Sequence, residues 1–321
     1  MVDISQVEFP FYKYYYSVEY VLKNFQDLKN YQFDYIKLNE KKHKNILYMI
    51  DIDFKRDSRF LRITDYFSEE CRVICNFADM ISPQEYFKLN KEVIIKSLGN
   101  SPKYDDIDSY IYNSGLIQCS NFNLIVATSI LRFFKPKRWL DPSAGWGDRL
   151  IAAINYGQCE YRATDPNECL HPKYNAMIDI LAEEKTIQDE RGKRPKYHIT
   201  QEGFETAEIE ANYYDLVFTS PPFFDLEKYS NSPTQSHIKF QTLEEWMDGF
   251  MYPFLIKCVA SLIKGGHLGL YVEDNKKSGT FYVDKIKSYL NDNKRMKFIG
   301  FISWQANRRP RKIMIYQKIK K

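Results

Sequence analysis

Short apolar runs alternate with longer stretches of helical periodicity from about residue 135 to the end of the chain. The apolar runs predict five strands, at 137–141, 160–165, 196–201, 214–220 and 267–274. The stretches between them predict helices at 147–157, 168–184, 242–263 and 282–292. Regular alternation of strands with helices is typical of βα units, which build a parallel sheet covered by helices.

The third of these helices has recognisable ends. It opens on Thr242 and Glu245, the spacing of a capping box, and it is expected to stop at Gly265-Gly266. Two further strands, at 298–304 and 312–319, are separated only by the turn QANRRPRK. A parallel return needs a long crossover, so this last pair must be antiparallel. We therefore predict an α/β fold whose parallel sheet ends with an antiparallel strand.

The first 110 residues follow a different pattern. They contain an aromatic and basic run at 9–16, a strand-like run at 46–54 and a helix that begins at Ser82-Pro83. A helix at 121–134 then leads into the first strand of the α/β part. We predict an N-terminal α+β accessory domain at 1–115, with a possible role in target recognition, followed by an α/β domain at 116–321.

The composition limits the class of protein and the kind of partner that the chain can have. The 321 residues are 44% hydrophobic and 27% charged, as in a globular protein with a sizeable core. The net charge of +4 permits a polyanion partner through a local patch without requiring one. An aromatic content of 16% leaves two explanations open, AT-rich coding and ligand binding.

The cysteines and histidines do not suggest a metal site. Cys71 and Cys75 are four residues apart and would share a helix face, but no second pair accompanies them. Buried reduced thiols are therefore favoured over zinc ligands. The N-terminus has no signal-peptide pattern, and the apolar stretches fall short of the roughly 20 residues that cross a bilayer. We expect an intracellular protein, cytoplasmic or nuclear and not secreted, without a membrane partner.

The segment LDPSAGWGDRL (140–150) is a strand, a glycine loop and a helix start. Gly145 and Gly147 allow a sharp turn and a close approach to a ligand. The spacing is neither that of a dinucleotide fingerprint nor that of a P-loop. Asp141 ends the strand, where an acid suits a cationic ligand, and Asp165 ends the next strand, where a carboxylate can bind ribose hydroxyls. The alternative is that the glycines only form a strand–helix turn.

The segment TSPPFF (219–224) ends the fourth predicted strand. Two prolines cannot continue a ladder, because neither has an N–H and each fixes φ. Two phenylalanines follow where a surface loop is usually polar. The segment therefore predicts a rigid corner with a polar and an aromatic side.

DPSAGWGDRL, ATDPNE and TSPPFF, in this order, resemble the S-adenosylmethionine-dependent amino-methyltransferases of nucleic acids. The resemblance covers roughly 120–321 and implies a Rossmann-like class I methyltransferase sheet with an antiparallel last strand. It also implies S-adenosyl-L-methionine as cofactor. The methionine part would lie against Asp141, Ser143, Ala144, Gly145 and Gly147, the ribose against Asp165, and the adenine near Phe204.

The resemblance assigns the transfer chemistry to Ser220, Pro221, Pro222 and Phe223. An exocyclic amine is a weak nucleophile because its lone pair is delocalised, and acceptors aimed at its N–H bonds favour the reactive form. The Ser220 hydroxyl and the Pro221 carbonyl would be those acceptors, held by the stiff Pro-Pro backbone. Phe223 would stack on a base that has left its duplex. Phe224 is expected to pack in the core.

The sequence leaves both the target base and the target polymer undecided. Ser220 favours cytosine N4, whereas the motif order also fits many adenine N6 enzymes. DNA is favoured over RNA as the nucleic-acid partner, and an RNA base, a protein glutamine or a non-catalytic role is the alternative. The long polar loop 225–241 predicts a lid or substrate loop. The basic turn 307–312 and the runs 13–16 and 54–62 are candidate contacts to the polymer, with a solvated or structural role as the alternative.

Overall fold

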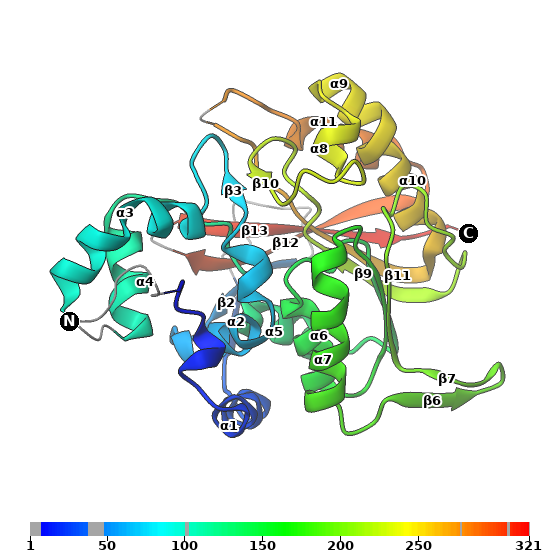
Figure 1. Ribbon diagram of the computed structural model, residues 1–321. Helices are drawn as coiled ribbons and strands as arrows, with labels where there is room; N and C mark the ends of the chain where they lie inside the picture. The colour runs from blue at the N-terminus through cyan, green and yellow to red at the C-terminus, as the bar shows by residue number, and fades with distance from the viewer. Residues whose placement is uncertain (1–7, 38–47, 100–102, 277, 307–308, 321) are drawn as a thin grey trace.

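The computed structural model describes residues 8–37, 48–99, 103–276, 278–306 and 309–320. Nine of its strands form one sheet in the order β1-β2-β12-β13-β11-β9-β4-β5-β8 (Figure 1). The strands are β1 (Asp34–Lys37), β2 (Tyr48–Asp53), β4 (Arg138–Asp141), β5 (Glu160–Thr164), β8 (Tyr197–Thr200), β9 (Tyr214–Thr219), β11 (Leu262–Tyr271), β12 (Met296–Ala306) and β13 (Arg309–Lys318).

The predicted fold class is confirmed by the directions of these strands. β8, β5, β4, β9 and β11 pair in parallel, and β13 is antiparallel to both of its neighbours, β11 and β12. The sheet therefore has a Rossmann-like parallel part, with the antiparallel β13 inserted between β11 and β12, and the edge strand β1 is antiparallel to β2. The strand order reverses between β4 and β9, which places a crevice at their carboxyl ends.

Helices cover both faces of the sheet, and successive residues of the central strand β9 pack against opposite layers. In β9, Leu216 and Phe218 join the core with α1, α2, α5, α6 and α7, whereas Val217 joins the core with α9, α10 and α11. The helices are α1 (Val18–Lys29), α2 (Ser58–Arg72), α3 (Pro83–Leu98), α4 (Tyr104–Asn113), α5 (Leu124–Phe134), α6 (Asp148–Tyr156), α7 (His171–Leu181), α8 (Ser236–Lys239), α9 (Leu243–Trp246), α10 (Tyr252–Ser261) and α11 (Val283–Asp292).

The ends of some elements differ from the predictions. The capping box is present, since the Thr242 hydroxyl accepts from the Glu245 N–H at 3.2 Å and the Glu245 carboxylate accepts from the Thr242 N–H at 3.1 Å. The helix continues through a π-helical turn, Met247–Met251, but ends at Ser261. Gly265 and Gly266 lie inside β11, which starts at Leu262, and its pairing with β9 shifts between Leu262 and His267. The glycines therefore accommodate an irregular strand rather than stopping a helix.

Two short antiparallel strand pairs were not predicted from the sequence. β6 (Thr186–Asp189) and β7 (Gly192–Pro195) form a hairpin that projects from the body at the lower right of Figure 1. β3 (Asn76–Phe77) pairs with β10 (Glu227–Lys228), and this pairing joins the N-terminal part to the loop after the proline corner.

The N-terminal part shares the sheet and the core of the α/β part. β2 pairs in parallel with β12, and Ile63 of α2 belongs to the same hydrophobic core as the β9 residue Phe218. The sheet thus runs across the predicted boundary at 115/116, and the division into domains stays a prediction. Helices α3 and α4 have a small cluster of their own, around Phe87, Ile94, Ile107 and Ile111.

The cysteines correct the prediction of reduced thiols. Cys71 of α2 forms a disulfide with Cys169, which follows Asp165 on the chain. Helix α2 ends at Arg72, so Cys75 lies beyond it and does not share its face with Cys71. The free thiols of Cys75, Cys119, Cys159 and Cys258 are buried. A pairing of residues 98 apart depends on tertiary packing, which spacing alone does not show.

The described residues contain neither a cluster of metal ligands nor a membrane-spanning helix. No three His, Cys, Asp or Glu side chains there are grouped as ligands of a metal ion would be. No helix in the described ranges is long and apolar enough to cross a membrane.

The shared core predicts that the two parts unfold together. Ile63→Ala removes a side chain that is 0% exposed and should lower the free energy of unfolding by about 2–5 kcal/mol. Urea denaturation followed by circular dichroism should show a single transition at a lower midpoint. Leu89→Ala, at a site that is 69% exposed on α3, is the control and should change stability by less than about 0.5 kcal/mol. Two separate transitions would contradict the shared core.

Candidate functional site

The glycine loop connects β4 to α6 and is fastened to the end of β5. Gly145 adopts φ 60° and Gly147 φ 96°, in the left-handed region that favours glycine. The Gly145 N–H donates to the Asp165 carboxylate at 2.9 Å, and the Ala144 N–H donates to the Thr164 carbonyl at 2.9 Å. A Cβ at Gly147 would lie 2.5 Å from the Met177 sulfur, the end of a flexible side chain, so it is the positive φ that requires glycine here.

Asp141 is not free to meet a ligand. Its carboxylate is fully buried and accepts from the Arg149 guanidinium at 2.8 Å and from the Tyr161 hydroxyl at 2.8 Å. Arg149 therefore compensates the charge that the sequence assigned to a cationic ligand. Arg149 belongs to the quoted segment 140–150, but only the turn of the loop and the start of α6 bring its side chain back to Asp141.

Asp165 ends β5 and faces the cavity described below. Its two carboxylate oxygens accept from the main-chain N–H groups of Gly145 and Asn167, at 2.9 and 3.0 Å. Burial raises the pKa of Asp165 to about 6. Each carboxylate oxygen keeps a second acceptor position, so the group can still accept a hydrogen bond from a ligand hydroxyl.

The proline corner directly follows β9, at the same edge of the sheet. Pro221 is buried, whereas Ser220, Pro222 and Phe223 are half-buried. The Phe223 ring lies edge-on to Tyr271, with 5.7 Å between ring centroids. Phe224 is buried with φ 48° and packs on Trp246, which confirms its predicted core position.

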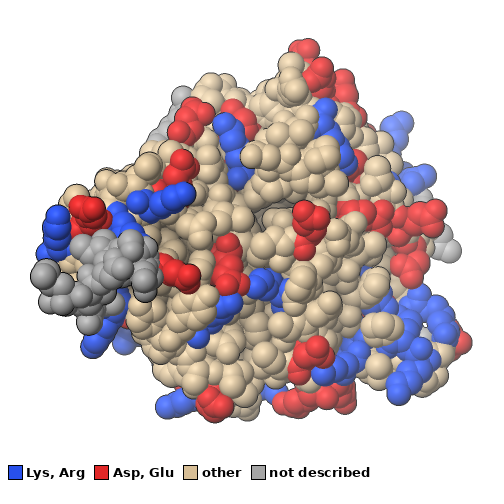
Figure 2. All heavy atoms as spheres, viewed as in Figure 1, with Lys and Arg blue, Asp and Glu red and all other residues tan. Residues whose placement is uncertain are grey.

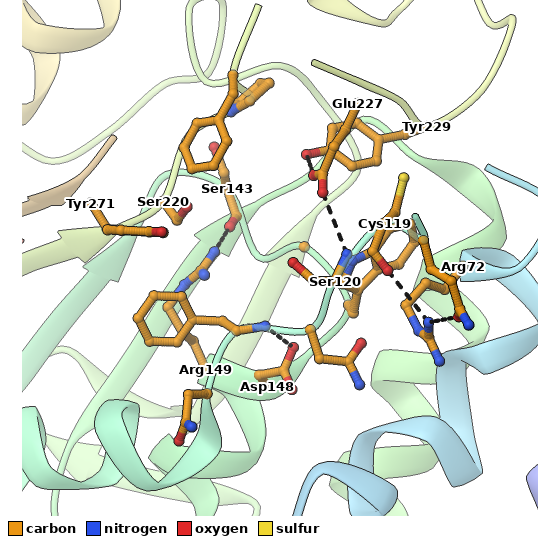
Figure 3. Close-up of a pocket in the computed structure, with 18 of the residues that line it drawn as sticks. Arg72, Cys119, Ser120, Ser143, Asp148, Arg149, Ser220, Glu227, Tyr229 and Tyr271 are labelled. Carbon is orange, nitrogen blue, oxygen red and sulfur yellow. Dashed lines mark hydrogen bonds between the residues drawn. The ribbon is translucent and has the colours of Figure 1, made fainter. Parts of the chain in front are cut away.

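A cavity of about 880 Å³ joins the glycine loop, the β5 acid and the proline corner. In Figure 3, Ser220 and Tyr271 lie on one side of it, Ser143 and Arg149 in the middle, and Cys119 and Arg72 on the far side. The predicted site residues that line it are Ser143, Gly145, Asp165, Phe204, Ser220, Pro222 and Phe223. Those that are not among the lining residues are Asp141, Ala144, Gly147 and Pro221.

Several lining residues were not identified from the sequence. Phe122, which precedes α5, and Trp304 of β12 lie 5.8 Å apart between ring centroids and build an aromatic wall with Tyr271. Arg72 and Asp65, both from α2, form a buried ion pair at 2.8 Å. No local pattern marks these residues, because long-range packing brings them to the cavity.

Asp148 is a further lining residue, at the start of α6. Its carboxyl is buried and accepts from the Thr64 hydroxyl at 2.8 Å and from the Phe122 N–H at 3.2 Å. Burial raises the pKa of Asp148 to about 7. This side chain thus joins α2, α6 and the segment before α5 around the cavity.

The candidate polymer contacts are placed as follows. Arg311 forms an ion pair with Glu273 beside the cavity, so it is not at a solvated tip; Asn307 and Arg308 lie outside the described residues. Tyr14 and Tyr15 are exposed. Figure 2 shows acidic and basic side chains interspersed on this face, with basic ones gathered over the β6–β7 hairpin at the lower right. Among the described residues, Arg56 and Arg62 of the run 54–62 line the cavity together with Arg311.

Comparison with known proteins gives distant structural similarity. No protein-family model matches the chain, and no curated protein matches it. The chain is similar to the crystal structure of TrmN from Thermus thermophilus, with TM-score 0.43, 16% identity, and coverage of 62% of this chain and 49% of that one. It thus spans about half of the length of TrmN.

Two further similar structures have comparable scores. One is the magnesium protoporphyrin IX methyltransferase ChlM from Synechocystis PCC 6803 with bound SAM, with TM-score 0.41, 11% identity and coverage of 73% and 94%. The other is the tRNA (m1A58) methyltransferase TrmI from Aquifex aeolicus, with TM-score 0.38, 12% identity and coverage of 63% and 72%. At these scores the similarity identifies neither a substrate nor the role of a residue.

The buried carboxyl of Asp148 predicts a pH-dependent stability. The folded chain keeps a proton on Asp148 up to about pH 7, whereas the unfolded chain loses it near pH 3.8. The free energy of unfolding should therefore fall as the pH rises from about 4 to 7, by at most about 4 kcal/mol from this group. Asp148→Asn should flatten this dependence in urea denaturation at pH 5 and pH 8. Asp284→Asn, whose side chain is 96% exposed, is the control, and an unchanged slope in Asp148→Asn would contradict the assignment.

Proposed function

We propose that the protein transfers a methyl group from S-adenosyl-L-methionine to the exocyclic amine of a nucleobase, adenine N6 or cytosine N4, in DNA. One observation carries the proposal: the proline corner with Ser220 and Phe223 lines the same cavity as the glycine loop and Asp165. These segments lie at the carboxyl ends of β4, β5 and β9, the edge at which open α/β sheets bind ligands.

The residues present fit this cofactor. Asp165 keeps acceptor positions for ribose hydroxyls. A ligand can approach the main chain at Gly145 closely, because glycine has no side chain. Phe204 provides a flat apolar wall in the same cavity. The methionine part would meet Ser143 and the loop around it, whereas the charge of Asp141 is compensated by Arg149. When bound, the cofactor supplies an electrophilic methyl group on a sulfonium.

The chain's own residues would prepare the amine. The Ser220 hydroxyl, which lines the cavity, would accept a hydrogen bond from one amine N–H and so favour the nucleophilic form of the nitrogen. Pro221 is buried behind it, and the two prolines fix the backbone that carries the Pro221 carbonyl as a second acceptor. Phe223 would stack on the base, and the aromatic wall that includes Tyr271 would exclude water.

The cofactor proposal predicts a binding defect in Asp165→Ala. This change removes the acceptor at the end of β5, so the affinity for S-adenosylmethionine should fall at least about tenfold in calorimetry. Asp284→Ala, an exposed acid on α11, should bind like the wild type. Asp141→Ala is a poor probe, because it would leave the Arg149 charge buried without its partner and destabilise the fold. A wild-type protein that does not bind the cofactor would refute the proposal.

The transfer proposal predicts label on an exocyclic amine. Purified protein, labelled cofactor and either duplex DNA, single-stranded DNA or RNA are incubated, and the nucleosides are analysed by mass spectrometry. Ser220→Ala and Phe223→Ala should each lower the rate by about 10²-fold or more, because acceptor and stacking interactions are lost. Phe281→Ala, at a site that is 59% exposed, should keep wild-type activity.

The acceptors in that experiment separate the alternatives. Label on DNA at adenine N6 or cytosine N4 supports the full proposal. Label only on RNA keeps the chemistry but replaces the polymer. Label on a ring carbon, on a ribose hydroxyl or only on protein would contradict the mechanism assigned to Ser220.

A further inference from the structure

The segment after the proline corner crosses the cavity from one wall to the other. Tyr229 packs its ring on Trp146 of the glycine loop, with 5.5 Å between centroids. Further along, the Thr234 hydroxyl donates to the Pro166 carbonyl, beside Asp165, at 3.5 Å. Lys239 of α8 then forms an ion pair at 2.7 Å with Glu205, which follows β8. This loop therefore covers the ends of β4, β5 and β8, the half of the cavity assigned above to the cofactor.

Gln235 is the residue of this segment that lacks a complete set of partners. It is 5% exposed and lines the cavity, and its side-chain Nε2 is buried without a hydrogen-bond partner. Its neighbours are already engaged, since the Ser236 hydroxyl accepts from the Trp246 indole at 3.3 Å and Thr234 bonds to Ser232. A buried donor without a partner is unfavourable, which points to a ligand that supplies an acceptor.

The surroundings of Gln235 favour a flat heterocycle with polar groups on its edge. Phe204 and Phe250 line the same cavity and are 2% and 4% exposed, so they offer apolar ring surface. A primary amide has both a donor and an acceptor at its tip. Adenine presents the matching pair, an amino group next to a ring nitrogen, and glutamine binds this edge through two hydrogen bonds.

We propose that the Gln235 side chain binds the adenine edge of the cofactor, so that the loop that begins at the proline corner also completes the cofactor site. This inference rests on the proposed function. The same continuous segment would then hold the target base through Phe223 and the cofactor through Gln235. Binding of the cofactor would thereby affect the position of the residues that hold the target base, and binding of the base would affect those that hold the cofactor.

The test compares two ligands that differ only on this edge. S-adenosyl-L-homocysteine presents the N6 amino group beside the N7 acceptor, whereas S-inosyl-L-homocysteine presents two acceptors, O6 and N7, of which the amide can match only one. In calorimetry the wild type should bind the adenine ligand about 10- to 100-fold more tightly. Gln235→Met has a side chain of similar length without hydrogen-bonding groups, and it should bind the two ligands within about threefold of each other. Gln241→Ala, at an exposed glutamine of the same segment, should keep the wild-type ratio.

The outcomes test the role of Gln235 and the proposed function separately. If Gln235→Met keeps the wild-type ratio, the role of Gln235 is wrong and the proposed function stands. If the wild type binds neither ligand, the proposed function itself fails. Without ligand, Gln235→Met should unfold at the wild-type temperature or higher, because it removes an unpaired donor. If neither it nor Gln235→Glu, which keeps the shape and exchanges the donor for an acceptor, folds, Gln235 has a structural role and the inference is overturned.

Discussion

The reversal of strand order between β4 and β9 is the constraint on which the site depends. The two strands are parallel neighbours, but the chain leaves them toward opposite faces of the sheet, through α6 on one side and the α9–α10 region on the other. Their carboxyl ends therefore bound a crevice that no helix fills. The glycine loop, the acid of β5 and the proline corner open into this crevice because each directly follows a strand that ends there.

Buried ionisable groups hold the walls of the crevice in place. Arg149 pairs with Asp141 behind the glycine loop, and Asp148 accepts hydrogen bonds from Thr64 and Phe122. A buried polar or charged group is costly unless it is paired or hydrogen-bonded, so each of these groups specifies the position of its partners. Asp141 consequently stabilises the glycine loop, whereas Asp165 and Ser143 line the cavity, where a ligand can contact them.

The N-terminal part contributes directly to this arrangement. Thr64 and Arg72 come from α2, and β3 pairs with β10 of the loop that crosses the cavity. The Cys71–Cys169 disulfide joins α2 to the segment after Asp165. The described residues before 116 thus contribute to the sheet, the core and the cavity wall.

Much of the fold could be predicted from the sequence because its signals are local. Apolar runs of strand length, the Thr242 capping box and the short turn before β13 determined the elements and the antiparallel strand. The glycines at 145 and 147 and the prolines at 221 and 222 marked the loops that face the crevice, since backbone geometry requires those residue types. Only the tertiary structure decided which charges are compensated, that Cys71 meets Cys169, and that Gln235 is buried over the cavity. These depend on how the chain packs, and the local sequence pattern around any one of these residues does not identify the partner that packing brings to it.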